Sequence, residues 1–436
     1  MSIRDSHKSA LLHPHSRTSQ LPIPAEFGPF FFDQTLDHLH TITTKFPQRY
    51  WVNPQNYHTN GPVILFNVGE LDATGFDGLV IDSFLHDLAQ DLNGIAVVIE
   101  HRYYGNSTPF PSLNLENLRF LNTYQALEDM ANFIRTVKNH HTPNPIVSFP
   151  RINRFIFCQF PNINFTLPPA PRTPWIVYGV SYAGNLAAWM RKNYPEIVFA
   201  AIASSAPVQA NVSFWQYREP ILWYGPKRCI DAIISTVDQV DQILFGNDEN
   251  AKKILYKKFG FEGEGDYSFA NWISEPVDIW QNSTYSNSPF LDFCAIFDNS
   301  TTPTEYFDAY AGYVKTVESK SLSQADNAWG YQTCTEYGYW QHAAPKGHPS
   351  LVSRKLDIDG FQNYCHSIGI NSLPNVTDIN LRYGGWNVDL THTIWVNGEW
   401  DPWRGLSVQS PNAPKKKSTA DAPLVLIPQA VHGWVC

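Results

Sequence analysis

The chain has 436 residues, of which 43% are hydrophobic and 16% are charged, and its formal net charge at pH 7 is −9. This composition is typical of a globular protein with room for more than one packed unit, and it excludes a disordered chain. It also argues against a nucleic-acid binder, because the one basic run, Lys415 to Lys417, lies among Pro, Ser and Thr residues typical of a solvated loop.

Residues 1–28 are expected to be disordered or to come from an incorrect gene start. The first 25 residues carry only a three-residue apolar run, Ala10 to Leu12, which is too short for the core of a signal peptide. No stretch of the chain approaches the ~20 apolar residues that a membrane span needs. The sequence therefore predicts no membrane span and shows no export signal.

Residues 29–208 alternate short apolar runs with helical patterns. The apolar runs are short, β-branched and bounded by Gly or Pro, which is typical of buried strands. Helical spacing of apolar residues predicts helices at Leu127 to Val137 and at Leu186 to Met190. Strands that alternate with helices predict an α/β core with a parallel sheet covered on both faces. The predicted strands are Val63–Phe66, Ile95–Ile99, Trp175–Tyr178 and Val198–Ala203.

An unusual segment at residues 144–173 separates the helix that ends near Lys138 from the strand that starts near Trp175. Such connections are usually only ~2–6 residues long. One hypothesis is a surface loop. The other is a retained intron, because Val147-Ser148 could be encoded by a GTNAGT splice donor. Sequencing the transcript distinguishes them, because an intron would be absent from mature message.

The pattern changes between residues 209 and 374, where β-branched runs are few and aromatic and acidic residues are many. Residues 375–436 then return to a strand pattern. The simplest interpretation is a sheet that begins in residues 29–208, is interrupted by a helical cap domain at 209–374, and finishes in 375–436. The predicted cap helices include Asp231–Leu244 and Glu305–Val317, and the predicted late strands are Thr393–Val396 and Leu424–Ile427.

The six cysteines show no CxxC motif and no Cys/His spacing of a metal site. Cys229 with Cys294, and Cys334 with Cys365, would suit two disulfides. Six N-x-S/T sequons give mild support for a secretory route. We therefore expect an extracellular or vacuolar/lysosomal protein, although no signal peptide is visible. The sequons are at Asn106, Asn164, Asn211, Asn282, Asn299 and Asn375.

The strongest local signal for chemistry is Gly179-Val-Ser181-Tyr-Ala183-Gly184, which lies between a predicted strand and a predicted helix. The nucleophile elbow of α/β-hydrolases requires this context, and its turn is so sharp that the flanking residues must be small. The N-terminus of the following helix also directs its dipole and N–H groups towards developing negative charge. We expect Ser181 to be a nucleophile. The alternative is an ordinary Gly-rich strand-to-helix turn with a buried serine.

A nucleophilic serine needs a general base, and the base needs an orienting acid. In this fold the order along the chain is Ser, acid, His. Asp401 and His432 each follow a predicted strand in a loop, at the edge where catalytic groups of parallel sheets gather. We therefore expect Asp401 to be the acid and His432 the base. Asp401 could instead be an ordinary turn aspartate before proline, in which case Glu399 is the competing acid. His432 could instead be a structural histidine.

Two backbone N–H groups are expected to stabilise the oxyanion. One belongs to Tyr182, directly after Ser181, and the second should come from a loop after an early strand. That loop is Phe66-Asn-Val-Gly69-Glu70, in which Gly69 would let the backbone approach closely. Glu70 is either a buried structural acid or a group that faces the amino group of a substrate.

Several motifs occur together in the order of one family. These motifs resemble those of the prolyl-specific serine peptidases, and they are GVSYAGNLAAWMR, EHRYYGNSTPF, FPQRYW and NGEWDPWRG. That family includes lysosomal Pro-X carboxypeptidase, dipeptidyl peptidase II and the fungal prolyl endopeptidases. The stretches Asn67 to Gly75 and Tyr339 to His342 are most similar to fungal members. The resemblance extends from about Phe31 to His432, interrupted by residues 144–173.

The resemblance implies an α/β-hydrolase core with a helical cap domain and cleavage after proline under mildly acidic conditions, without a metal or other cofactor. The family's serine, aspartate and histidine correspond to Ser181, Asp401 and His432. Trp403 corresponds to an aromatic wall of the proline pocket, which suits a flat apolar ring, whereas plain core packing is the alternative. Asn185 stands where some members carry a larger apolar residue. The chain stops four residues after His432, where relatives continue with a terminal helix, so a truncated chain is expected.

Together these observations predict a serine peptidase that hydrolyses peptide bonds on the C-terminal side of proline through an acyl-enzyme. The expected partners are proline-containing peptides and no nucleic acid, and the sequence allows a homodimer. One alternative is an esterase or lipase on the same core. Another is a catalytically impaired relative that acts as a binding protein.

Overall fold

The computed structural model describes residues 23–40, 42–137, 167–263, 265–282, 288–317 and 324–434. Residues 1–22 of the predicted disordered start and residues 144–166 of the predicted insertion lie outside these ranges. The short helix η1 (Ala25–Phe27) buries the ring of Phe27. The folded core therefore reaches back to Ala25 instead of starting at residue 29.

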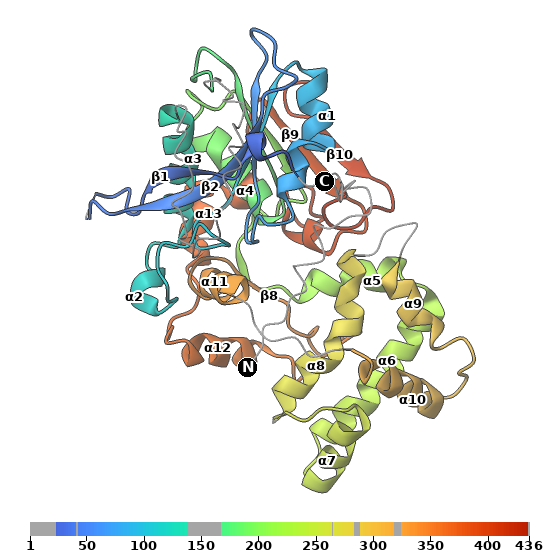
Figure 1. Ribbon diagram of the computed structural model, residues 1–436. Helices are drawn as coiled ribbons and strands as arrows, with labels where there is room; N and C mark the ends of the chain where they lie inside the picture. The colour runs from blue at the N-terminus through green and yellow to red at the C-terminus, as the bar shows by residue number, and fades with distance from the viewer. Residues whose placement is uncertain are drawn as a thin grey trace, which may run out of the picture.

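Eight strands form one sheet in the order β1-β2-β4-β3-β5-β6-β9-β10 (Figure 1). β2 runs antiparallel to both β1 and β4, whereas the remaining neighbours pair in parallel. With a strand-turn-helix at the centre of this sheet, the fold is that of an α/β-hydrolase. The strands are β1 (Phe30–Thr35), β2 (Lys45–Asn53), β3 (Val63–Asn67), β4 (Ile95–Ile99), β5 (Trp175–Val180), β6 (Ala200–Ser204), β9 (Thr393–Gly398) and β10 (Leu424–Ile427).

All six predicted strands are present, and they are β3, β4, β5, β6, β9 and β10. The expected start of β6 at Val198 is too early, because Val198 donates its N–H to the carbonyl of Tyr194 in the turn after a helix. The sheet also contains β1 and β2, two strands that were not predicted from the sequence.

The central strands are buried on both faces, which is why they consist of continuous apolar runs. One face packs against α3 (Thr123–Thr136) and α4 (Tyr182–Asn193). The other face packs against α1 (Phe84–Asp91) and η2 (Asp77–Val80). β5 and α4 are thus packed within these layers, which position the turn between them.

The chain leaves the sheet after β6 and returns at β9, although these two strands are paired neighbours. The segment between them contains most of the helices, and α5 to α10 form a separate lobe beside the sheet (Figure 1). We call α5 to α10, with η4, the helical lobe. Its elements are α5 (Glu219–Tyr224), α6 (Lys227–Leu244), α7 (Glu249–Lys258), α8 (Asp266–Asp278), η4 (Ile279–Asn282), α9 (Pro289–Ala295) and α10 (Pro303–Val314).

The remainder of the inserted segment packs closer to the sheet. Trp329, Tyr337 and Tyr339 join the same apolar cluster as α3 and α4, and Tyr383 stacks on Trp189 with ring centroids 4.5 Å apart. The remaining elements are α2 (Leu115–Leu118), β7 (Asn211–Ser213), η3 (Trp215–Arg218), α11 (Gln324–Gln332), the π-helical turn η5 (Thr333–Tyr337), β8 (Gly338–Trp340), α12 (Ile358–Ser367), α13 (Val376–Tyr383), η6 (Gly385–Asn387) and η7 (Pro402–Leu406).

Both predicted disulfides are present. Cys229–Cys294 ties α6 to α9 inside the helical lobe, and Cys334–Cys365 ties η5 to α12. Such bonds stabilise a fold mainly by restricting its unfolded chain. They are typical of proteins that fold in an oxidising compartment.

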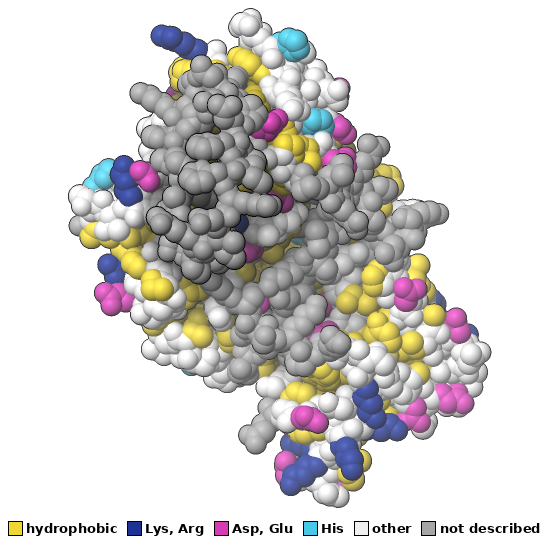
Figure 2. Space-filling model, viewed as in Figure 1, with side chains coloured by type: hydrophobic (Ala, Val, Ile, Leu, Met, Phe, Trp, Pro, Cys, Tyr) yellow, Lys and Arg dark blue, Asp and Glu magenta, His cyan; other side chains and the backbone are white. Residues whose placement is uncertain are grey.

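The surface combines charges of both signs on the face drawn in Figure 2. At the tip of the helical lobe, lysines of α7 lie beside acidic side chains, and Lys258 pairs with Asp308. Exposed pairs of this kind contribute little to stability. Among the described residues, no helix has the length and apolar character that crossing a membrane requires.

Candidate active site

Ser181 lies in the turn between β5 and α4, with φ 58° and ψ −129°. This backbone conformation is strained for a residue with a side chain. The flanking glycines are needed for close approach: a Cβ on Gly179 would lie 2.0 Å from the carbonyl oxygen of Ala183, and one on Gly184 would lie 2.7 Å from that of Ser204. The Gly-x-Ser sequence thus folds into the sharp strand-to-helix turn that its spacing predicts.

Asp401 and His432 form a buried pair. Asp401 follows β9 and His432 follows β10, and their exposed fractions are 0% and 1%. The Nδ1 atom of His432 lies 2.9 Å and 3.1 Å from the two carboxylate oxygens of Asp401. Asp401 also accepts the backbone N–H of Trp403 at 2.8 Å. A proton held on Nδ1 by the carboxylate leaves Nε2 as the basic nitrogen of a neutral imidazole.

The competing acid, Glu399, makes a different contact. Its carboxylate accepts the backbone N–H of Gln429 at 3.1 Å, within the same pair of loops. Asp401 is therefore the acid that contacts His432, whereas Glu399 ties one loop to the other.

Backbone contacts bring the nucleophile turn and the base loop to one edge of the sheet. Ser181 donates its N–H to the carbonyl of Ser204 at 2.9 Å, and the hydroxyl of the next residue, Ser205, accepts the N–H of Gly433 at 3.0 Å. Gly398 lets the base loop cross the end of β9, because a Cβ there would lie 2.3 Å from the carbonyl oxygen of Ala430. The parallel strands β5, β6, β9 and β10 thus present their carboxyl ends, and the three candidate residues, together.

The two expected oxyanion donors are in different situations. Tyr182 begins α4, and the first N–H groups of a helix have no acceptor within it. Gly69 packs against the same helix start, because a Cβ there would lie 3.3 Å from that of Ala183. The N–H of Gly69, however, already donates to Asn67 Oδ1 at 2.8 Å. A role for Gly69 as a donor would require this bond to be shared or exchanged.

Glu70 is a buried carboxyl group next to the base. It is 5% exposed, and among the described residues no donor reaches its Oε2 atom. Burial raises the pKa of Glu70 to about 7, whereas its own backbone N–H and the nearby charge of His432 act in the opposite direction. Such a group changes its charge within the range in which hydrolases operate.

Trp403 is a buried ring at the centre of an aromatic cluster. Its ring centroid lies 5.4 Å from that of Tyr339 and 6.1 Å from that of His432. Asn185 lies behind this cluster, where its side-chain amide donates to the carbonyl of Pro207 at 3.1 Å and to the hydroxyl of Tyr339 at 3.3 Å. Asn185 therefore supports the ring of Tyr339, a residue that the sequence indicated only as part of a motif.

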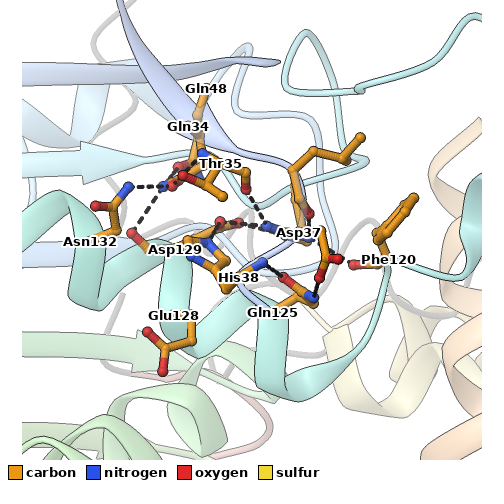
Figure 3. A network of polar contacts seen from close by, with 12 residues as sticks. Gln34, Thr35, Asp37, His38, Gln48, Phe120, Gln125, Glu128, Asp129 and Asn132 are labelled. Carbon is orange, nitrogen blue, oxygen red and sulfur yellow. Dashed lines mark hydrogen bonds and ion pairs between the residues drawn. The ribbon is translucent and has the colours of Figure 1, made fainter. Parts of the chain in front are cut away.

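The His-Arg-Tyr-Tyr sequence that follows β4 supports the helix start. His101 Nε2 lies 3.1 Å from the hydroxyl of Tyr182, and burial lowers the pKa of His101 to about 4, so the ring is neutral under most conditions. Arg102 donates two hydrogen bonds to Asp129, which also contacts His38. Figure 3 shows this network between β1 and α3, where it joins the sheet to the helix layer.

Within the described parts of the chain, no group of three or more His, Cys, Asp or Glu side chains could hold a metal ion. The ionisable and nucleophilic groups described at this edge are Ser181, the Asp401–His432 pair and Glu70. A hydroxyl on a strained turn, with an oriented imidazole on a loop at the same edge of the sheet, suits nucleophilic catalysis.

In sequence, the chain is similar to known serine peptidases. The family model "Serine carboxypeptidase S28" matches residues 34–149, 157–304 and 281–433. A "Probable extracellular serine carboxypeptidase" from Arthroderma benhamiae is 31% identical over 99% of this chain, which spans 66% of that protein. "Serine protease vicPb" from Bipolaris victoriae is 27% identical over 92% of this chain and 83% of its own length. Human "Lysosomal Pro-X carboxypeptidase" is 27% identical over 91% of this chain and 82% of its own length. The chain belongs to the S28 family of serine carboxypeptidases, a family of serine-type peptidases.

Proposed function

We propose that the protein is a serine peptidase that cleaves on the C-terminal side of proline through an acyl-enzyme. The observation that carries the proposal is the buried Asp401–His432 pair, whose base loop is joined to the nucleophile turn through Ser204 and Ser205. Ser181 Oγ bonds to the substrate carbonyl carbon while its proton passes to His432 Nε2. That proton then moves to the leaving nitrogen as the carbon–nitrogen bond breaks. Water attacks the ester in the same way, which releases the acid and restores Ser181.

The specificity for proline is supported by the aromatic cluster around Trp403. Flat rings suit a pyrrolidine ring, which offers apolar surface and no N–H donor once it is in a peptide. Trp403 lies next to both Asp401 and His432, so a ring bound against it would place the following bond near the base. The name of the human relative also points to a prolyl bond.

Glu70 would bind the amino group of a short substrate. Its buried carboxyl lies close enough to His432 for their charges to interact. An ammonium group placed against it would stabilise the ionised carboxylate. This contact would favour substrates with a free amino group near the proline.

The protein is expected to act outside the cytoplasm, in the extracellular space or in an acidic compartment such as a vacuole or lysosome. The two disulfides and the printed names of two relatives, "extracellular" and "lysosomal", support this location.

Digestion of a peptide library, followed by mass spectrometry, tests the reaction. We expect new termini directly after proline, and we expect none with Ser181→Ala. p-Nitrophenyl esters assayed in parallel provide the comparison with an esterase. Selective hydrolysis of esters without cleavage after proline would contradict the proposal, and so would a folded protein that hydrolyses neither substrate.

A further inference from the structure

The helical lobe contacts the acid loop directly before Asp401. Trp280, in η4, donates its indole N–H to the carbonyl oxygen of Trp400 at 2.9 Å. The two indole rings pack together, with centroids 5.8 Å apart. The backbone N–H of Trp400 in turn donates to the carbonyl of Ala430 at 2.9 Å, in the loop that carries His432. One residue of the lobe therefore holds the peptide on the N-terminal side of Asp401.

The next residue of the lobe holds the other side of Asp401. Gln281 is 0% exposed, and its Oε1 atom accepts the indole N–H of Trp403 at 3.0 Å and the hydroxyl of Tyr217 at 2.7 Å. Trp403 itself donates its backbone N–H to Asp401. Substitution of Gln281 would therefore affect the Asp401 carboxylate through one intermediate residue, Trp403.

The helical lobe also packs against the base loop. Val431, directly before His432, is buried in the same apolar cluster as the Cys229–Cys294 disulfide and the inner faces of α6 and α9. Trp400 and Trp434 pack at the edge of this cluster. The acid loop and the base loop thus share one support, which lies outside the sheet that carries them.

We propose that Trp280 and Gln281 are positioning residues that keep Asp401 in register with His432. The inference rests on the function proposed above. Trp280 bonds to Trp400, directly before Asp401, and Gln281 bonds to Trp403, two residues after it, so the acid loop is held on both sides of the carboxylate. Small displacements of a catalytic group are costly, because proton transfer requires hydrogen-bond distance. The helical lobe thereby takes part in the reaction.

Two variants test the proposal independently. Gln281→Leu removes the acceptor of the Trp403 indole, and Trp280→Phe removes the donor to Trp400 while keeping an aromatic ring. The matched control is Tyr310→Phe, which removes a buried hydrogen bond at 2.7 Å from the hydroxyl of Tyr310 to the carbonyl of Ile273, inside the lobe. The first readout is the rate at which a fluorophosphonate probe modifies Ser181. The second is the far-downfield proton NMR signal of the His432–Asp401 hydrogen bond.

We expect Gln281→Leu and Trp280→Phe to react roughly 10- to 10²-fold more slowly than the wild type and to lose or broaden the downfield signal. Tyr310→Phe should keep both the rate and the signal. If both folded variants keep the wild-type rate and signal, the positioning role is contradicted. A wild-type protein that the probe does not modify at all would instead overturn the proposed function, and this inference with it.

Discussion

The hydroxyl oxygen of Ser205 accepts a hydrogen bond from the backbone N–H of Gly433 at 3.0 Å. Ser205 directly follows β6, and the preceding carbonyl, that of Ser204, accepts the N–H of Ser181. The consecutive residues Ser204 and Ser205 therefore contact the nucleophile turn and the loop that carries His432, respectively. Ser205 has a φ of 47°, which is unfavourable for a residue with a side chain and is retained where surrounding contacts enforce it.

Replacing Ser205 with alanine should loosen the base loop. We expect Ser205→Ala to lower kcat/KM on a proline peptide roughly 10- to 10²-fold, because the loop that carries His432 would lose its hydrogen bond to the residue after β6. The free energy of unfolding should fall by about 1–3 kcal/mol, since the N–H of Gly433 would be buried without an acceptor. Steady-state kinetics and chemical denaturation measure the two effects.

Ser274→Ala is the control for that experiment. Ser274 is also buried, and its hydroxyl donates to the carbonyl of Asn271 at 2.9 Å, within α8. Its loss should lower stability slightly without changing the rate. Equal rates for the two variants would show that Ser205 does not position the base.

Replacing Asp401 with asparagine should remove most of the activity. We expect kcat to fall about 10⁴-fold, the size of the effect when the aspartate of a Ser–His–Asp triad becomes asparagine. The side-chain amide cannot hold the imidazole with its proton on Nδ1. Glu399→Gln should remain close to wild type, because Glu399 contacts Gln429 and not His432. The opposite ranking of the two variants would assign the acid role to Glu399.

The stability of the protein should depend on pH through Glu70. Burial raises the pKa of Glu70 to about 7, above its ordinary value of 4.5, so between these values the folded state holds a proton that the unfolded state releases. The resulting stability is fully present below pH 4.5 and is lost as the pH rises through about 7. Over this window Glu70 lowers the free energy of unfolding by up to about 3 kcal/mol.

Chemical denaturation of the wild type and of Glu70→Gln at pH 5 and pH 7 measures this effect. The variant should lose less stability between the two values than the wild type. A remaining pH dependence is expected, because burial also raises the pKa of Glu336 to about 7. An equal loss of unfolding free energy between pH 5 and pH 7 in the two proteins would show that Glu70 does not cause this pH dependence.

Removing the Cys229–Cys294 disulfide should destabilise the helical lobe. The bond closes a loop across 65 residues, for which chain entropy predicts a loss of about 4 kcal/mol. We expect a double Cys→Ala variant to unfold at lower denaturant concentration, with lower activity, since the cluster that buries Val431 surrounds this bond. Unchanged unfolding of the variant would show that the lobe is held by its apolar packing alone.

Local patterns predicted the parts of the fold that depend on neighbouring residues. The β-branched runs of β3, β4 and β5 are buried on both faces, and each run predicts a strand without information from the rest of the chain. The turn at Ser181 is also predictable, because its small flanking residues lie between a strand pattern and a helix pattern, and in the structure a Cβ on Gly179 or Gly184 would clash.

Contacts between distant parts of the chain were not predictable in the same way. Gln281 and Trp403 are 122 residues apart, and nothing in the sequence near either residue indicates its partner. Prediction from local sequence was also incomplete at Gly69. Its N–H was expected to face an oxyanion, but in the structure it donates a hydrogen bond to the side chain of Asn67. Asn and Asp commonly make such short-range bonds, which compete with other uses of the backbone.

Trapping the acyl-enzyme is the most direct test of the central claim that Ser181 attacks the substrate with the help of His432. An N-blocked prolyl p-nitrophenyl ester would be mixed with the enzyme, quenched with acid during the first turnover, and mapped by mass spectrometry. We expect a burst of p-nitrophenol equal to the enzyme concentration and the acyl group on Ser181, with neither in His432→Ala. An acyl group on another residue, or turnover without any acyl group on Ser181, would contradict the account.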